Sequence, residues 1–512
     1  MCQMKNSVRS VWCVGVGLVL AGAAGGQDAR SGLDLEGDVV TVMSPLRVDA
    51  SRQVGPVATA LSFDRSMYDV IDHAKLVHMR AFPIDGTTTV DLDLETFDVM
   101  APNVTRVRGT AEGDVTSPDP EIVLLRGEVV GEPDSWVYLA LSPMMNNGVI
   151  EMNGTTYIVS SGDPKLGNNP VVYNLTDLPE GEIDWYQYVC ETVGTPADFG
   201  DQLEGLSGGG MEAPCRRADM AVETDTEFAG LFSSDPEIAE NMANAYIATL
   251  MGGVDTIYTN EWNMRIRIVY TRVWPDPSVP DPWENPTTVD ELFVLQGLWT
   301  PTGAPYSGEW NGVHLLSGRP LGGGVAFLNA ICNKEISHAV SGNLNGFFPT
   351  PIVDNDSQNW DLVVTSHEWG HNFGAPHTHG LLPVVDACGF GDCSQAENGT
   401  IMSYCHLCPG GLANIALHFA PRILDEGIIP YVTLSMPCNL DLFSLAECQG
   451  GSDCPADTNG DGVLTTADFT AWIIAYNAGD LAADANRNGT LEPADFSAWL
   501  QSWQTGCDDG GG

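Results

Sequence analysis

Residues 367–377 have the sequence His-Glu-Trp-Gly-His-Asn-Phe-Gly-Ala-Pro-His. On a helix, His367 and His371 lie four residues apart and project from the same face, one turn above the other. Gly374 then allows the backbone to leave the helix through a conformation that other residues resist. The turn brings His377 back toward the pair. Three neutral imidazole nitrogens with one open position are typical of a catalytic zinc site, whereas a structural site closes all four positions with protein ligands.

Glu368 directly follows the first of these histidines. From there its carboxylate can reach a water molecule on the metal without binding the metal itself, as a general base for hydrolysis does. The alternative is a helix with ordinary core histidines, but that alternative does not account for the glycine and the third histidine at this spacing. We therefore predict that His367, His371 and His377 bind Zn²⁺ and that Glu368 is the catalytic base.

Length and charge limit the remaining interpretation. A chain of 512 residues is too long for one ordinary core, so about two to four domains are expected. The chain has 21 Lys and Arg against 68 Asp and Glu, a net charge of -47. A field of this sign repels phosphate, which argues against nucleic acid and anionic membrane surfaces as partners. Calcium binding or solubility outside the cell would explain the acidic excess.

The amino-terminal residues have the pattern of a signal peptide. Lys5 and Arg9 precede an apolar run from Val11 to Ala21, and small residues follow through Gly26. The run is too short to span a bilayer, and no later segment has the roughly 18 uninterrupted apolar residues of a membrane helix. We expect residues 1–26 to be removed and the mature chain to be secreted, extracellular or associated with the cell surface, without a membrane span.

The cysteine count is odd after export. Without Cys2 and Cys13, eleven of the 13 cysteines remain, and in an oxidising compartment disulfides are expected rather than thiolate zinc sites. One thiol is left over. Cys190 is the natural candidate, because it alone precedes the glycine-rich stretch near residue 208, although a disulfide with Cys215 is an alternative.

Residues 27–212 have the pattern of a β-rich domain. Short apolar runs are separated by turn residues, and helical periodicity is scarce. We expect a turn at residues 146–148, Asn-Asn-Gly, and a linker or processing site at Gly205–Gly210. The strands predicted here are Val39–Val42, Thr89–Leu94, Ile122–Leu125, Trp136–Leu141 and Val149–Met152.

Residues 213–440 alternate strand and helix patterns, which argues for a mixed sheet flanked by helices. Pro236–Ile257 begins with proline and has apolar residues on one face, as an amphipathic helix does. Asp361–Phe373 is the helix that would carry the first two histidines. The strands predicted here are Asp219–Thr224, Met264–Tyr270, Gly312–Leu316 and Gly323–Phe327.

About 25 residues after the third histidine comes Gly399-Thr400-Ile401-Met402-Ser403-Tyr404-Cys405. The histidine motif followed by such a methionine turn resembles the metzincin zinc peptidases. Asn372–Ala375, Cys332 and Cys438 are similar to the reprolysin or adamalysin branch. The resemblance implies an α/β metzincin catalytic domain with a mixed twisted sheet over residues 213–440. It also implies Met402 as an apolar floor under the metal and Gly323–Phe327 as the edge strand that binds a peptide.

The resemblance has further implications and one departure. Tyr404 matches the position where the astacin and serralysin branches place a tyrosine near zinc, so it is a candidate transition-state donor. Residues 27–212 become a propeptide, and Cys190 becomes a candidate zymogen switch that binds zinc as a thiolate. Its local sequence lacks the rest of the family's switch motif, and a disulfide or an inert thiol is the alternative. Thr378 replaces the aspartate that usually follows the third histidine, so a contact beneath the metal ligands is expected to differ.

Residues 453–507 contain a repeat with calcium-loop spacing, the two copies being 27 residues apart. Each copy leads into a helix with Phe and Trp on one side, so two half-modules would share one apolar core. The repeat resembles a dockerin, a small all-α module that binds Ca²⁺ and docks onto a cohesin-like or cell-envelope receptor; an acidic turn repeat without calcium is the alternative. The predicted calcium ligands are Asp457, Asn459, Asp461, Val463 and Asp468 in the first loop, and Asp484, Asn486, Asn488, Thr490 and Asp495 in the second.

Together these features predict a multidomain, secreted, zinc-dependent endopeptidase that is made as a precursor, acts on proteins or peptides and docks through its carboxy-terminal module. The alternative is a calcium-dependent extracellular adhesion or scaffold protein with a catalytically silent peptidase domain. The intact Glu368 argues against silence, because a binding module has no need of a base.

Overall fold

The computed structural model describes residues 39–55, 57–175, 190–193, 215–348, 360–436, 438, 440–442, 456, 458, 466–478, 483, 485 and 491–505. The predicted signal peptide, residues 1–26, and the glycine-rich stretch, residues 205–210, lie outside the described residues. Within the described part of the chain, no helix has the length and apolar content needed to cross a membrane.

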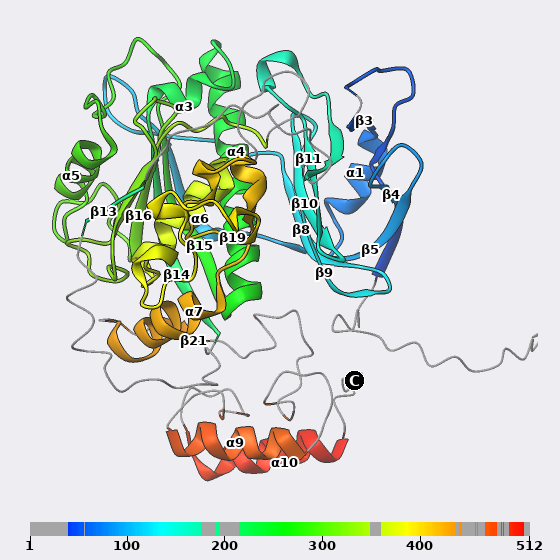
Figure 1. Ribbon diagram of the computed structural model, residues 1–512, viewed down its shortest axis with the longest axis vertical. Helices are drawn as coiled ribbons and strands as arrows, with labels where there is room; N and C mark the ends of the chain where they lie inside the picture. Colours follow the sequence, from blue (N-terminus) through cyan, green and yellow to red (C-terminus); the bar gives the residue numbers. More distant parts are fainter. Residues whose placement is uncertain are drawn as a thin grey trace, which may run out of the picture.

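The amino-terminal region forms one ten-stranded sheet, at the blue and cyan end of the chain in Figure 1. Its strands follow the order β1-β4-β5-β8-β9-β10-β11-β12-β3-β2, and all neighbours are antiparallel except β1 and β4. Helix α1, Arg65–Ile71, starts at Asp64, whose side chain accepts a hydrogen bond from the amide of Ser66. The strands are β1 Val39–Met43, β2 Leu46–Val48, β3 Ala58–Phe63, β4 Leu76–Pro83, β5 Thr89–Phe97, β8 Val123–Val129, β9 Glu132–Leu141, β10 Asn146–Met152, β11 Thr155–Ser160 and β12 Val171–Asn174.

The strand predictions in this region are confirmed, but the predicted turn at residues 146–148 is wrong. These residues begin strand β10 and pair with Leu141, Ala140 and Leu139 of β9. The side chains of Asn146 and Asn147 are buried, where Asn146 Nδ2 donates to Asn168 and Asn147 Oδ1 accepts from the amide of Phe348. Tertiary partners therefore override the local turn preference of Asn-Asn-Gly.

The second sheet is mixed, as the sequence predicts. Its order is β13-β17-β18-β16-β14-β15-β6-β7, with β21 beside β14. The four strands β18, β16, β14 and β15 are parallel, and β17 runs antiparallel to β18. The strands are β6 Met100–Arg108, β7 Val115–Thr116, β13 Glu191–Val193, β14 Arg216–Thr224, β15 Met264–Val273, β16 Gly312–Leu316, β17 Gly324–Phe327, β18 His338–Ser341 and β21 Asp441–Leu442; β19 Gly399–Thr400 and β20 Ile415–Ala416 form a separate pair.

Helix α4, Pro236–Trp262, lies between the two sheets (Figure 1). Asp235 caps its first turn, and the helix ends at Asn263, which adopts a left-handed conformation at φ 57°. Almost every residue from Ala239 onward is buried, because neighbours cover the helix on all sides. Helix α6, Trp360–Asn372, packs against it on the side of the second sheet. The other helices of this region are α3 Thr226–Gly230, α5 Thr288–Leu298 and α7 Pro421–Ile423.

Near the carboxyl end, α9, Thr466–Ala478, and α10, Pro493–Thr505, form a pair of helices. Among the described residues, their shared core contains Trp472 and Trp499 with Ala456 and Ala483.

Candidate metal centre

The structure brings the three predicted histidines together. His367 and His371 project from one face of α6, and their Nε2 atoms lie 3.1 Å apart. The Nε2 atom of His377 lies 3.1 Å from each of them. The chain turns back at Gly374, which has φ +103° and whose Cα faces Tyr431; a Cβ there would lie 2.7 Å from the tyrosine Cβ.

Backbone carbonyls set the tautomers of the first two imidazoles. Nδ1 of His367 donates to the carbonyl of Ile401 at 2.6 Å, and Nδ1 of His371 donates to that of Ala375 at 2.7 Å. With Nδ1 protonated, Nε2 carries a lone pair and points into the triad. Burial lowers the pKa of His371 to about 4 and holds the pKa values of His367 and His377 well below 6.5. The triad is therefore neutral at pH 7.

The unprotonated Nε2 atoms of His367 and His371 cannot hydrogen-bond to each other, so their convergence with Nε2 of His377 calls for a cation. A triangle with sides of 3.1 Å leaves room for one ion about 2.0–2.1 Å from each corner, the usual Zn–N distance. Nitrogen donors with a second hydrogen bond to a carbonyl are the usual way in which proteins hold zinc. The residues present therefore fit a zinc ion.

The methionine turn packs against the helix that carries His367 and His371. Met402 is fully buried, and Gly370 of α6 faces it closely enough that a Cβ there would lie 3.0 Å from the methionine Sδ. The resemblance predicts aspartate at position 378, where this chain has threonine. Thr378 donates from its amide and from its Oγ1 to the carbonyl of Met402, at 3.2 and 3.3 Å. Threonine therefore ties the loop of His377 to the turn without a charge.

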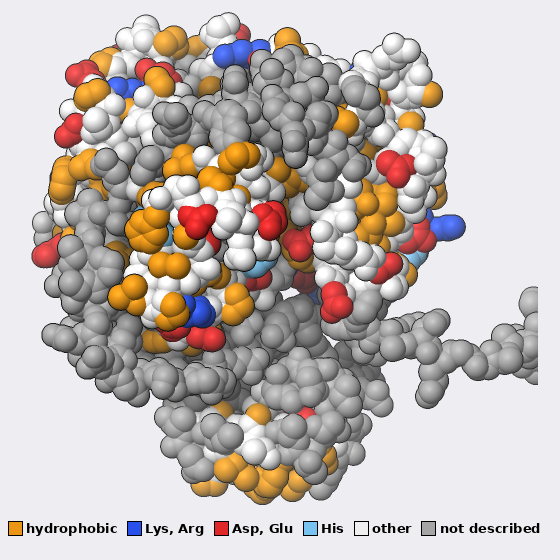
Figure 2. Space-filling model, in the orientation of Figure 1, with side chains coloured by type: hydrophobic (Ala, Val, Ile, Leu, Met, Phe, Trp, Pro, Cys, Tyr) orange, Lys and Arg blue, Asp and Glu red, His pale blue; other side chains and the backbone are white. Residues whose placement is uncertain are grey.

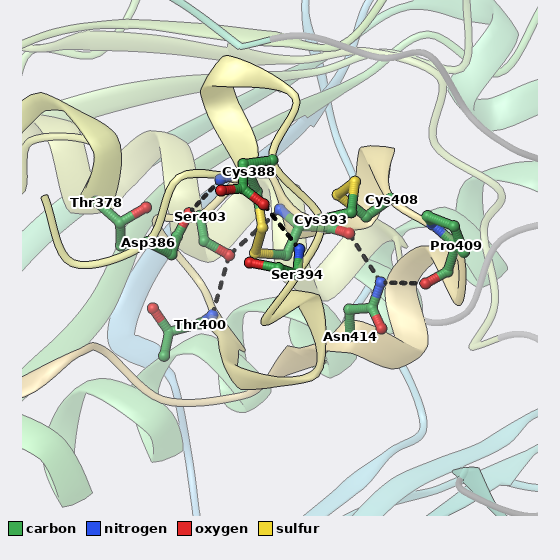
Figure 3. Close-up of a disulfide and its surroundings, with 12 residues drawn as sticks. Thr378, Asp386, Cys388, Cys393, Ser394, Thr400, Ser403, Cys408, Pro409 and Asn414 are labelled. Carbon is green, nitrogen blue, oxygen red and sulfur yellow. Dashed lines mark hydrogen bonds between the residues drawn. A yellow bond between two sulfur atoms is a disulfide. The ribbon is translucent and has the colours of Figure 1, made fainter.

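Two disulfides hold the segment that contains this turn (Figure 3). Cys388 bonds to Cys405, and Cys393 bonds to Cys408. Asn414 adds hydrogen bonds from Nδ2 to the carbonyls of Cys405 and Pro409, both at 2.9 Å. The loops around the three histidines have little regular secondary structure. Disulfides and a side-chain amide therefore hold them in place.

Glu368 lies beside the triad and is fully buried. Burial raises its pKa well above 4.5. Its carboxylate packs against the backbone of β17, where a Cβ on Gly324 would lie 2.1 Å from Oε1. Sequence reasoning missed this glycine, because the pattern Gly-Gly-Gly at residues 322–324 indicates a bend but not what approaches it.

Cys190 is the fourth group at the centre. It remains a thiol, so the alternative of a disulfide with Cys215 is wrong. Its Sγ lies 3.3 Å from Oε2 of Glu368 and 3.4 Å from Nε2 of His371. Among the described residues, Cys190, His367, His371 and His377 form a group whose donor atoms could hold one metal ion.

The backbone around Cys190 follows the edge of the sheet. Directly after it, β13 pairs in parallel with β17, Glu191 opposite Val325 and Val193 opposite Phe327. The hydroxyl of Tyr404 donates to the carbonyl of Cys190. The predicted transition-state donor and the predicted edge strand therefore both contact the segment that carries the predicted switch cysteine.

Two more histidines surround the triad without entering it. The ring of His379 stacks on that of His377, with centroids 5.1 Å apart and planes 9° apart, and it also contacts Tyr404. His406 is buried between Tyr404 and Trp360. Neither belongs to the group of converging donor atoms, so both pack around the centre rather than bind at it.

Of the ligands predicted for each calcium loop, only the last lies among the described residues. Asp468 and Asp495 are both fully buried near the starts of α9 and α10. Asp495 accepts a hydrogen bond from the amide of Glu492 at 2.7 Å. The remaining predicted calcium ligands lie outside the described residues: Asp457, Asn459, Asp461, Val463, Asp484, Asn486, Asn488 and Thr490.

Comparison with solved structures gives weak likenesses. Metalloproteinase-II from Bacteroides fragilis is 11% identical, with 69% of this chain and 89% of that chain covered at a TM-score of 0.36. A chaperone-substrate complex is 11% identical, with 59% and 48% covered at a TM-score of 0.23. Likenesses at these TM-scores support no conclusion about this chain. No curated protein matches it.

Residues 215–411 match the protein family Reprolysin_5, described as metallo-peptidase family M12. The matched residues include the three converging imidazoles, the buried glutamate and the methionine turn. Site geometry and family match thus agree, and they support a metallopeptidase domain in this part of the chain.

Proposed function

We propose that this protein is a zinc-dependent endopeptidase that is exported and made as an inactive precursor. The observation that carries the proposal is the convergence of three neutral Nε2 atoms beside a buried carboxylate. The reaction is hydrolysis of a peptide bond in a protein or peptide substrate.

Zinc held by His367, His371 and His377 would supply Lewis-acid chemistry, which polarises a scissile carbonyl and acidifies a water molecule. Glu368 takes a proton from that water and later passes it to the leaving amine. Tyr404 donates to the oxygen of the scissile carbonyl, in place of the Cys190 carbonyl to which it now donates. Strand β17 offers its free edge to the substrate backbone once β13 has left it.

Cys190 blocks this arrangement in the precursor. Its Sγ lies within 3.4 Å of both the base and one imidazole, which supports a thiolate that occupies the position a catalytic water needs. β13 covers the substrate edge at the same time. Cleavage between Val193 and the start of β14 would allow both to withdraw.

The carboxy-terminal helices are proposed as a calcium-dependent docking module of the dockerin type. Asp468 and Asp495 support calcium loops, because each stands at position 12 of its repeat and is fully buried near the start of its helix. Apolar side chains gather over the outer surface of these helices in Figure 2. On α9 and α10, the side chains of Phe469, Ile473, Phe496 and Leu500 are each more than a third exposed. A receptor of the cohesin type or in the cell envelope would cover such a face.

The test uses the full chain after cleavage in residues 194–214. Incubation with a mixture of random peptides, followed by mass spectrometry, should reveal cleavage products. Glu368→Gln replaces the carboxylate by a neutral amide of the same shape, and the variant should retain one zinc per chain by elemental analysis while losing cleavage. Persistent cleavage by this variant would rule out the assigned base, and absence of stoichiometric zinc from both proteins would rule out the metal centre.

A further inference from the structure

The amino-terminal region does more than place Cys190 at the active site. Strand β6 belongs by sequence to the region before the linker, yet it extends the peptidase sheet beyond β15. Ile268 lies opposite Met100, and Tyr270 to Val273 lie opposite Thr105 to Arg108. The amide of Ile268 donates to the carbonyl of Val99 at 2.7 Å, and that of Gly109 donates to the carbonyl of Val273 at 2.9 Å. Without β6, the ten-residue, mostly buried strand β15 would become an open sheet edge.

The two regions also share one core around α4. Tyr138 of β9 is fully buried, and its hydroxyl donates to the carbonyl of Thr249 in α4. A Cβ on Gly252 would lie 2.7 Å from the hydroxyl oxygen of Tyr138, and a Cβ on Gly253 would lie 2.9 Å from Leu362 of α6. This pair of glycines therefore lets α4 approach the amino-terminal sheet on one side and the zinc-binding helix on the other. The apolar cluster is continuous from Leu124 and Tyr138 to Met402.

Charges across this contact are satisfied in pairs. Glu240 of α4 has 3% of its surface exposed, and both of its carboxylate oxygens accept from the amino-terminal region: Oε1 from Ser117 at 2.6 Å and Oε2 from Arg108 at 2.8 Å. Asp255, fully buried on the same helix, pairs with Arg126 of β8 at 3.3 Å. Separation of the regions would remove the partners of Glu240 and leave a charge that is costly to bury alone.

The contact that follows Cys190 is much shorter than the contact made by β6. There, β13 adds three residues to β17 at the opposite edge of the sheet from β6. The amino-terminal half of the chain is therefore attached twice: by the short strand β13 at one edge of the sheet, and by the long strand β6, a shared core and ion pairs of two buried carboxylates at the other side.

We propose that the amino-terminal region, residues 39–175, is a permanent partner of the peptidase domain, and that the mature enzyme is a complex of two pieces. Cleavage of the chain between β13 and β14 releases only β13 from β17. The contacts of β6 with β15 and of the amino-terminal sheet with α4 persist. This inference rests on the proposed precursor for its biological meaning, but the association itself depends on neither zinc nor activity.

The experiment is a cut followed by size-exclusion chromatography. A recognition sequence for a site-specific protease is inserted among Gly208–Gly210 of the full chain, the purified protein is cut, and the fragments are separated in non-denaturing buffer at micromolar concentration. Both fragments should elute together at the volume of the uncut chain. Hydrogen exchange should leave the amides of Ile268 and Tyr270–Val273 as protected as before the cut. An amino-terminal fragment that elutes by itself would overturn the proposal.

A matched pair of variants ties the association to this interface. Glu240→Ala removes the acceptor of Ser117 and Arg108, and in the cut protein it should weaken the association at least about tenfold, measured by dilution and re-chromatography. Glu112→Ala changes an exposed carboxylate on the turn between β6 and β7 and should have no effect. Equal retention in both variants would show that Glu240 does not hold the pieces together. Because neither readout uses peptide cleavage, failure here is distinct from failure of the peptidase assignment.

Discussion

Gly324→Ala tests whether the close approach of β17 to the general base matters for catalysis. The added Cβ would lie 2.1 Å from Oε1 of Glu368, 2.6 Å from its Cδ and 2.7 Å from its Cγ, whereas ordinary contacts begin near 3.4 Å. The carboxylate has to retreat by about 1.3 Å or β17 has to move by a similar amount. Since a misplacement of about 1 Å costs on the order of 10²-fold in rate, we expect kcat of the cut enzyme to fall roughly 100-fold.

The assay is steady-state cleavage of a fluorogenic peptide, with zinc measured by elemental analysis on the same samples. The zinc content should stay at one per chain, because no imidazole changes. KM should change much less than kcat, since the base acts in the chemical step. Gly297→Ala is the matched control, because a Cβ on this exposed glycine of α5 meets nothing within 4 Å. A kcat within twofold of the unsubstituted enzyme, with zinc retained, would refute the proposed packing of Glu368 against Gly324.

Three further variants test the remaining parts of the site. Cys190→Ser in the uncut chain should raise peptide cleavage at least about tenfold, because a hydroxyl binds zinc far more weakly than a thiolate; an unchanged rate would mean that the thiol does not block the site. Tyr404→Phe in the cut enzyme should lower kcat by about 10²-fold or more, the usual cost of losing one oxyanion donor, and an unaltered kcat would remove the tyrosine from the reaction. Replacement of both Cys393 and Cys408 by serine opens a link across 15 residues and should destabilise the methionine turn by about 3 kcal/mol, seen as a lower Tm in calorimetry; an unchanged Tm would show that the turn does not need this link.

Local spacing made the metal centre predictable. The four-residue separation of His367 and His371 sets their common face whatever the surroundings, because the helical period is a property of the backbone. In the same way, apolar periodicity predicted α4 and the central strands, although packing extended α4 to Trp262. The odd cysteine count also pointed to a thiol at Cys190 without any knowledge of the fold.

The turn predicted at residues 146–148 shows where local preference is insufficient. Asn-Asn-Gly favours a turn in an isolated chain, but here the strand pairs with β9 and its asparagine side chains bind partners far along the sequence. The local sequence pattern does not reveal those partners, because they lie far away in the chain.

By itself, then, the sequence determined that three histidines converge, that a glutamate lies beside them and that the surrounding domain is of the mixed α/β class, because these depend on residue type and on spacing within a few turns of chain. Only the tertiary structure decided that Ile401 fixes the tautomer of His367 and that β6 completes the peptidase sheet. It also decided that Cys190 lies against Glu368. These contacts join residues tens to hundreds of positions apart. They form only when the whole core packs, so no local pattern encodes them.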